Sequence, residues 1–321
     1  MPRLCIDFAR RAAQHGAVIR SAVALCVVAM VCACTVQQRP NHPRPALPAH
    51  YPPVPVPEIL ELEAADCGRQ LGVLAHGEER VRFEVRRHPR AAGEPPRPLV
   101  LLVPILAGGK ELMGLVAEHV RGEGFDVAFC ERAGSALSPP QRGPELDELF
   151  RRTVLHQRLL LAWLRAGDEP PPHVHVLGMS MGGIVTTVLA AHEPTIDSVA
   201  ICLAGADLAG LVLVTSERRV HRWLDWRQDT DGIGSDSLYW EIRQFLEHEP
   251  ARFAAQVPTE KVLFVSAAFD TVVPRRNQSL LWEGLGRPQR LDVPFGHYTA
   301  AVAVGQVIGA AAAHFRARQD R

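Results

Sequence analysis

A serine flanked by glycines lies in the middle of the chain, where a short apolar run gives way to a longer one. The segment reads Gly178-Met179-Ser180-Met181-Gly182-Gly183. From the glycine and serine content of the whole chain, the pattern G-x-S-x-G would be expected only about 0.06 times by chance. Flanking glycines permit a turn sharp enough to expose a serine hydroxyl between a strand and a helix. The amide of Met181 would then stand at a helix N-terminus, facing a developing oxyanion. We predict that Ser180 is a nucleophile and that Met181 donates to the oxyanion.

A serine hydroxyl needs a base, and the base needs a carboxylate to orient it. His297 and Asp270 each follow an apolar run late in the chain. Ligands of open α/β sheets bind outside the carboxyl ends of the strands, so both side chains are expected beside Ser180. Asp207, which follows the run ending at Leu203, remains an alternative acid. Asp292 lies too near His297 along the last run to reach it easily.

Strand-like and helix-like segments alternate around these residues. The first candidate strand, Val81–Arg87, alternates apolar and polar residues, whereas the later ones are mostly continuous apolar runs, typical of strands buried on both faces. The later candidate strands are Leu99–Val103, Phe125–Phe129, His175–Leu177, Val199–Leu203, Val262–Ser266 and Arg290–Val293. The candidate helices are Lys110–Arg121, Glu145–Arg165, Gly183–Ala191, Gln278–Glu283 and Ala300–Arg316. This alternation predicts an α/β fold with a mostly parallel, doubly wound sheet and helices on both faces.

The alternation lapses between Asp207 and about Pro258. This segment holds three of the five tryptophans, Trp223, Trp226 and Trp240. We predict an inserted helical cap here, over the carboxyl ends of the strands. Its aromatic residues either line an apolar acyl pocket, with at least one indole facing Ser180, or form the core of the cap itself.

The chain order Ser180, Asp270, His297, together with the glycine-rich turn, resembles the α/β-hydrolase superfamily and specifically its esterase-like members. The resemblance covers roughly Pro98 to Phe315. It implies an α/β-hydrolase fold, with Ser180 as nucleophile, His297 as general base and then acid, and Asp270 as the residue that orients the imidazole. It also implies a second oxyanion donor in the loop after Leu99–Val103, where Leu106 stands at the donor position. Many members have His-Gly where this chain has Pro104-Ile105, so the donor is assigned to within one residue.

The first 33 residues have the features of an export signal. Four arginines precede an uncharged run, Ala22–Ala33, whose 12 residues are too few to span a bilayer. The run ends in Val31-Cys32-Ala33-Cys34, which resembles the cleavage and acylation site of bacterial lipoproteins. We expect a signal peptide over 1–33 and a lipid on Cys34, with ordinary signal cleavage or an uncleaved membrane helix as alternatives.

A proline-rich segment follows, with eight prolines between Thr35 and Glu58. Such a stretch is expected to form neither helix nor strand ladder and to act as an extended spacer. We therefore divide the chain into a signal peptide (1–33), a lipidated tether (34–59) and a hydrolase domain (60–321) with a cap at about 207–258. Three cysteines would remain in the domain, Cys67, Cys130 and Cys202, and no essential disulfide is expected among them.

Charge and composition narrow the possible functions. Lysine and arginine number 35 and so do aspartate and glutamate, so there is no basic surplus for binding nucleic acid. His173 and His175 could share one side of a strand, but no third metal ligand can be identified, and neither metal nor cofactor is expected. The predicted function is hydrolysis of small-molecule carboxylic esters by an enzyme anchored to a membrane of the bacterial envelope. A peptidase using the same triad and a non-catalytic binding protein on a hydrolase scaffold are the alternatives.

Overall fold

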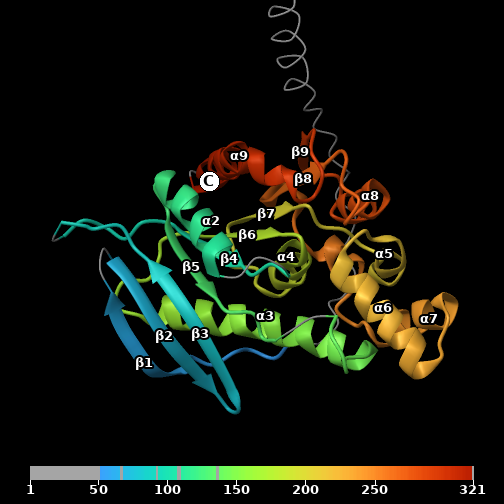
Figure 1. The fold of residues 1–321 in the computed structure, drawn as a ribbon. Helices are drawn as coiled ribbons and strands as arrows, with labels where there is room; N and C mark the ends of the chain where they lie inside the picture. Colours follow the sequence, from blue (N-terminus) through green and yellow to red (C-terminus); the bar gives the residue numbers. More distant parts are fainter. Residues whose placement is uncertain (1–50, 66–67, 92, 107–109, 135–136, 320–321) are drawn as a thin grey trace, which may run out of the picture. The chain divides into compact units, whose positions relative to one another are not determined.

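A nine-stranded sheet forms the centre of the domain. The computed structural model describes residues 51–65, 68–91, 93–106, 110–134 and 137–319. Within these residues the strand order is β1-β2-β3-β5-β4-β6-β7-β8-β9 (Figure 1). The strands are β1 (Glu58–Ala65), β2 (Arg69–His76), β3 (Glu79–Arg86), β4 (Leu99–Val103), β5 (Asp126–Cys130), β6 (Val174–Met179), β7 (Ser198–Cys202), β8 (Val262–Ala267) and β9 (Gln289–Val293). The neighbours from β5 to β9 are parallel, while β1, β2, β3 and β5 pair antiparallel in that order. The predicted α/β fold with a mostly parallel sheet is confirmed.

Helices cover both faces of the parallel strands, which explains why those strands are continuously apolar. Every residue of β4, β5, β7 and β8 is buried. One face packs against α2 (Lys110–Gly122) and α9 (Val304–Gln319). The other packs against α3 (Gly143–Ala166), α4 (Met181–His192) and α8 (Arg275–Gly284). Figure 1 shows α2 and α9 on one side of the sheet and α3 on the other.

The final helical stretch is both long and apolar. In the described part of the chain, Thr299–Gln319 is the one helical segment that could cross a membrane by length and composition. It consists of η5 (Thr299–Ala303) followed by α9, whose Val307, Ile308 and Phe315 are buried in the cluster that covers the sheet. These contacts are those of a core helix.

The N-terminal strands extend the sheet beyond the predicted one. Only β3 was expected, yet β1 and β2 precede it, and Glu58 and Ile59 of β1 pair with Ala75 and Leu74 of β2. The predicted tether, drawn to residue 59, therefore overlaps a strand. Most of β1 is exposed, so burial leaves no one-sided apolar pattern in its sequence.

The described residues just before β1 also pack on the domain. Tyr51 lies against the core, and the guanidinium of Arg158 sits 5.4 Å from the centre of its ring. Arg158 Nη1 donates to the carbonyl oxygen of Pro52 at 3.0 Å. Prolines lack an N–H but keep their carbonyl, so a proline-rich chain can still be held by side-chain donors. The packed domain thus begins no later than Tyr51, and the predicted spacer is too long at its C-terminal end.

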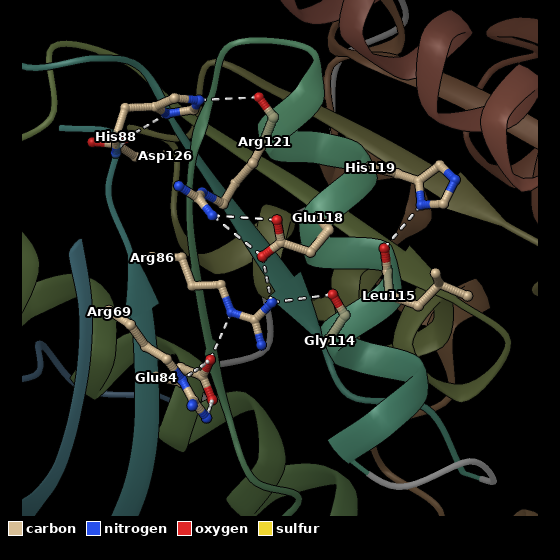
Figure 2. Close-up of polar contacts among 10 residues, drawn as sticks. All are labelled: Arg69, Glu84, Arg86, His88, Gly114, Leu115, Glu118, His119, Arg121 and Asp126. Atoms are coloured by element: carbon tan, nitrogen blue, oxygen red, sulfur yellow. Dashed lines mark hydrogen bonds and ion pairs between the residues drawn. The ribbon is translucent and has the colours of Figure 1, made fainter. Parts of the chain in front are cut away.

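Ion pairs fasten α2 to the antiparallel strands. Arg86 of β3 donates through Nε to Glu84 at 2.6 Å and through Nη1 to Glu118 of α2 at 2.7 Å. The same Nη1 donates to the carbonyl oxygen of Gly114 at 3.2 Å, and Arg69 of β2 binds the two Glu84 oxygens at 2.8 and 3.0 Å (Figure 2). Because α2 follows the loop that holds Leu106, this network anchors one end of that loop.

The segment between β7 and β8 is helical. It contains α5 (Leu208–Val214), α6 (Arg218–Asp231) and α7 (Ser235–Phe245), then the short turns η2 (Pro250–Arg252), η3 (Ala254–Gln256) and η4 (Thr259–Lys261). These elements occupy the stretch predicted as the cap, 207–258. That this segment forms a separate cap stays a prediction.

Candidate active site

Ser180 lies on a strained turn between β6 and α4. Its φ is 55° and its ψ is −124°, in a region that non-glycine residues rarely occupy. The backbone N–H of Ser180 donates to the carbonyl oxygen of Cys202 at 2.8 Å, which fixes the turn against β7. A Cβ at Gly178 would lie 2.2 Å from the carbonyl oxygen of Gly182, and one at Gly182 would lie 2.6 Å from that of Val103. The glycines of the motif are therefore required by close backbone packing.

Ser180, His297 and Asp270 form one hydrogen-bonded line. The distance from Ser180 Oγ to His297 Nε2 is 2.9 Å, and that from His297 Nδ1 to Asp270 Oδ2 is 2.8 Å. The other carboxylate oxygen of Asp270 accepts from the backbone N–H groups of Val272 and Val273 at 2.9 and 2.8 Å. Asp270 is buried, so these bonds hold its carboxylate in one orientation. The geometry is that of a nucleophile, a base and an orienting acid; the catalytic roles themselves stay a prediction.

The other two carboxylates considered from the sequence serve different purposes. Asp207 caps α5, where its side chain accepts from the N–H of Gly210 at 3.3 Å. Asp292 accepts from Ser266 Oγ and from Arg290 on the strands. Asp270 is the acid that contacts the imidazole of His297.

The two predicted oxyanion donors flank Ser180. Met181 is the first residue of α4, so its N–H has no acceptor within the helix. Leu106 and Ser180 line the same two cavities, and Met181 lines one of them. Leu106 and Met181 therefore both border the space at Ser180, and their roles as oxyanion donors stay predictions.

Arg132, which sequence reasoning did not single out, sets the direction of the Leu106 amide. Its Nη1 donates to the carbonyl oxygens of Ile105 and Leu106 at 3.0 and 2.6 Å, and its Nε donates to that of Gly134 at 2.5 Å. In a trans peptide the C=O and N–H point in opposite directions, so the Ile105 carbonyl facing Arg132 turns the Leu106 N–H away from it. An arginine directly after the apolar run of β5 was the available signal. We interpret Arg132 as a positioning residue for the oxyanion loop.

Two apolar cavities meet at Ser180. The larger, of about 210 Å³, lies among α2, η5 and α9, and His297 lines it together with Leu112, Val116 and Val307. The smaller, of about 90 Å³, lies beneath the cap, where Leu208, Leu211 and Val220 line it. Such concave apolar space beside a few polar groups is typical of sites for small molecules.

The cap tryptophans do not line either cavity, so the prediction that one of them faces Ser180 is wrong. Trp223 is fully buried and its Nε1 donates to the carbonyl oxygen of Gln141 at 2.8 Å. Arg142 sits 5.4 Å from the ring centre of Trp226, and Trp240 is 63% exposed. Trp223 and Trp226 pack against the residues that precede α3, Trp240 is exposed, and smaller aliphatic residues of α5 and α6 line the site.

Tyr298 and Glu217 add a polar pair beside the imidazole. The Tyr298 hydroxyl donates to the Glu217 carboxylate, joining the loop after β9 to the start of α6. Burial first, and then this hydrogen bond, raise the pKa of Tyr298 to about 12. Glu217 lines both cavities at Ser180. Neither residue stood out in the sequence, because a pair 81 positions apart has no local signature.

Other residues with titratable side chains take no part in the hydrogen bonds that join Ser180, His297 and Asp270. His175 is buried, its Nδ1 lies 2.8 Å from Ser198 Oγ, and burial lowers its pKa to about 4. Among the described residues no cluster of three or more His, Cys, Asp or Glu could hold a metal ion. Cys130 and Cys202 are buried free thiols whose pKa burial raises to about 12. The predicted lipidation site, Cys34, and the third cysteine expected in the domain, Cys67, lie outside the described residues.

Comparisons with known proteins agree with this fold. No family model matches the chain. The chain is 26% identical over 212 residues to the thermostable monoacylglycerol lipase of Bacillus sp. (strain H-257), covering 60% of this chain and 78% of that protein.

Solved structures that superpose on this chain include three hydrolases. A cold-adapted esterase from an Arctic intertidal metagenomic library has a TM-score of 0.54 at 16% identity, covering 81% of this chain and 97% of its own. Acetyl xylan esterase 1 from Thermoanaerobacterium sp. JW/SL YS485 superposes with a TM-score of 0.53 at 16% identity, and the match covers 78% of this chain and 88% of that one. The 2,6-dihydroxy-pseudo-oxynicotine hydrolase superposes with a TM-score of 0.56 at 16% identity, and the match covers 77% of this chain and 67% of that one. The domain has the α/β-hydrolase fold.

Proposed function

We propose that this protein hydrolyses carboxylic esters through an acyl-enzyme on Ser180. The observation that carries the proposal is the hydrogen-bonded line from Ser180 through His297 to Asp270, on a strained turn that opens into two apolar cavities. Similarity to a monoacylglycerol lipase and to esterases supports an ester as the substrate. A fold hosts many chemistries, so the choice among hydrolytic reactions depends on the site and on experiment.

The geometry supports the following sequence of steps. His297 Nε2 takes the proton of Ser180 Oγ as that oxygen attacks the ester carbonyl carbon, and the resulting imidazolium is stabilised by Asp270. The N–H groups of Met181 and Leu106 bind the oxyanion. When the tetrahedral intermediate collapses, His297 returns the proton to the leaving alcohol. Water then attacks the acyl carbon, again with His297 as base, which releases the acid and restores Ser180.

The positions of the cavities suggest where each half of the ester binds. The leaving oxygen must lie beside His297, which lines the larger cavity and does not line the smaller one. We therefore assign the alcohol to the larger cavity and the acyl group to the smaller one beneath the cap. Both halves are expected to be apolar next to the ester bond.

A matched pair of variants tests this assignment. Val307→Phe fills the larger cavity and Val212→Phe the smaller one. Val307→Phe should lower kcat/KM for esters with long alcohols, and Val212→Phe should lower it for esters with long acyl chains. The opposite pattern would reverse the two assignments.

The test of the reaction itself uses a fluorophosphonate probe, which labels an activated serine. The native protein should become labelled and should hydrolyse p-nitrophenyl esters, whereas Ser180→Ala should take no label. We expect its kcat to fall by about 10⁴ to 10⁶. Anilides with the same acyl groups serve as the peptidase control: faster cleavage of the anilides would favour the peptidase alternative. Absence of both labelling and turnover would favour a non-catalytic binding protein.

The proposed location is the cell envelope, with the domain tethered by a lipid on Cys34. The short apolar run Ala22–Ala33 and the acylation-type site that ends in Cys34 support it. Residues 35–50 would remain as the spacer, with a reach of roughly 50 Å if extended. Mass spectrometry should find a mature N-terminus at Cys34 carrying acyl chains. The Cys34→Ser variant should no longer be found in the membrane fraction. A mature N-terminus downstream of Cys34 would contradict the anchor.

A further inference from the structure

A third cavity, of about 660 Å³, borders the loop that carries Leu106. Its walls come from β1 to β3, from the residues that follow β5, and from the start of α6. Ile105 and Leu106 line both this cavity and the larger one at Ser180. The third cavity therefore adjoins the larger cavity at Ser180, with Ile105 and Leu106 between the two.

Three arginines line this space, Arg82, Arg132 and Arg219, of which Arg82 is exposed on β3. Arg132 and Arg219 both line the cavity, and neither forms an ion pair with any described carboxylate. The neighbouring segments 107–109 and 135–136, which the structure does not describe, contain no acidic residue in their sequence. Burial, and then the positive charge of Arg219, lower the pKa of Arg132. Arg132 and Arg219 thus face the same cavity, and no described carboxylate lies within ion-pair distance of either guanidinium group.

The acidic residues of this cavity are engaged or exposed. Glu84 is held between Arg69 and Arg86, as Figure 2 shows. Glu131 has a partner of its own, and Glu61 and Glu63 lie on the exposed edge strand β1. The carboxylates of Glu61 and Glu63 also face this cavity, so the attraction for an incoming anion must come from Arg132, which lies against the carbonyl groups of Ile105 and Leu106, and from the neighbouring Arg219.

We propose that this cavity binds an anionic group of the substrate, a carboxylate or a phosphate, through Arg219 and the Nη2 amino group of Arg132. A guanidinium presents paired N–H donors that match the oxygens of either anion. Arg132 uses Nε and Nη1 on backbone carbonyls, and none of the described residues accepts a hydrogen bond from its Nη2. The inference rests on the proposed ester hydrolysis and narrows its substrates to esters with an acidic group beyond an apolar section.

Paired substrates test the proposal and locate the acidic group. On the acyl side, p-nitrophenyl hemisuccinate is compared with its neutral methyl ester. On the alcohol side, 1-octanoylglycerol 3-phosphate is compared with 1-octanoylglycerol. The native protein should prefer the anionic member of at least one pair. Arg219→Gln should reduce that preference about tenfold, the expected size for a hydrogen bond to a charged group.

Arg222→Gln is the matched control, because it removes an equal charge from an exposed position on the same helix and Arg222 lines none of the three cavities. It should change the preference less than twofold. Equal preferences in the native protein and in Arg219→Gln, with neutral esters still hydrolysed, would overturn the anion site and leave the proposed function standing.

Binding of inorganic phosphate gives a readout that does not depend on turnover. Phosphate should raise the Tm of the native protein and of Arg222→Gln, and should raise that of Arg219→Gln much less. If no ester is hydrolysed but this difference appears, the proposed function fails and the anion site stands. If phosphate shifts all three proteins equally, the anion site is overturned.

Discussion

The parallel and antiparallel parts of the sheet are built and used differently. The parallel strands β4 to β8 are buried on both faces, and Ser180 and Asp270 follow two of them directly or within three residues. The antiparallel strand β1 is exposed along most of its length, with Leu62 at 51%. Catalytic distances must hold to a fraction of an ångström, and a close-packed interior transmits little movement. The comparison indicates that the proposed nucleophile and acid are carried by the most deeply buried strands of the sheet.

The antiparallel part reaches the site through charged contacts. Glu79 of β3 binds Arg152 and His156 of α3, and Arg86 joins β3 to α2. The same strands form one wall of the third cavity. This part of the domain therefore affects the loop around Leu106 and the shape of the third cavity, while Ser180 and Asp270 depend on the parallel strands.

The largest effect after loss of the nucleophile should come from Asp270→Asn, in the parallel part. Asparagine would favour the wrong imidazole tautomer, and kcat on p-nitrophenyl butyrate should fall by about 10⁴. Asp207→Asn, which alters the helix cap that follows a neighbouring strand, should lower kcat on the same ester less than tenfold. Similar losses in both variants would mean that the acid assignment is wrong.

A smaller effect is expected from Arg132→Met, at the junction of the two parts. Without its guanidinium the Leu106 amide loses its fixed direction, and loss of one oxyanion donor typically costs about 10² to 10³ in kcat. KM should change much less, and Arg132→Lys should retain part of the activity because it supplies one ammonium in place of the fork. A rise in KM with unchanged kcat would contradict the positioning role.

The next effect concerns stability and the attachment of the antiparallel part. Hydrogen bonding to Arg152 lowers the pKa of Glu79 to about 2, below its ordinary value of 4.5. Its stabilising contribution is present above pH 4.5 and is lost as the pH falls from 4.5 toward 2. Glu79→Gln should reduce the free energy of unfolding by about 2 kcal/mol at pH 7, measured by urea denaturation.

The pH dependence supplies the control for that variant. Between pH 4.5 and 2 the native protein should approach Glu79→Gln in stability, because the carboxyl group becomes neutral in both the folded and unfolded states. Glu148→Gln, which removes a carboxylate from an exposed pair with Arg151 on α3, should change stability by less than about 1 kcal/mol. A pH-independent difference between Glu79→Gln and the native protein would contradict the role of the ion pair.

The smallest effect should be that of Leu62→Ala on the edge strand. Leu62 is half exposed, so its truncation should alter the free energy of unfolding by about 0.5 kcal/mol or less. The same change at Leu101, which is fully buried on β4, should cost about 3 kcal/mol. Equal costs at the two positions would remove the contrast between the two parts of the sheet.

Local sequence patterns predicted where the parallel strands lie along the chain, because burial on both faces leaves continuous apolar runs. The turn at Ser180 was also readable, since its glycines are needed within a few residues of one another. Asp270 and His297 could be placed beside Ser180 because the carboxyl ends of parallel strands share one edge of the sheet. The strands β1 and β2 were missed, since a mostly exposed edge strand need not have a buried apolar face.

Several features depend on contacts between distant residues. Sequence alone could not choose with certainty between Asp207 and Asp270, and the structure gives Asp207 a cap and Asp270 the imidazole. Arg132 acts on carbonyl oxygens 26 and 27 residues earlier in the chain. The sequence by itself therefore determined the fold class, the nucleophile turn and the chain order of the triad, because each depends on local turn chemistry or on burial periodicity. The position of the cap indoles, the direction of the Leu106 amide and the pairing of two arginines around one cavity were decided by tertiary packing, because they depend on which side chains meet after the chain has closed its long loops.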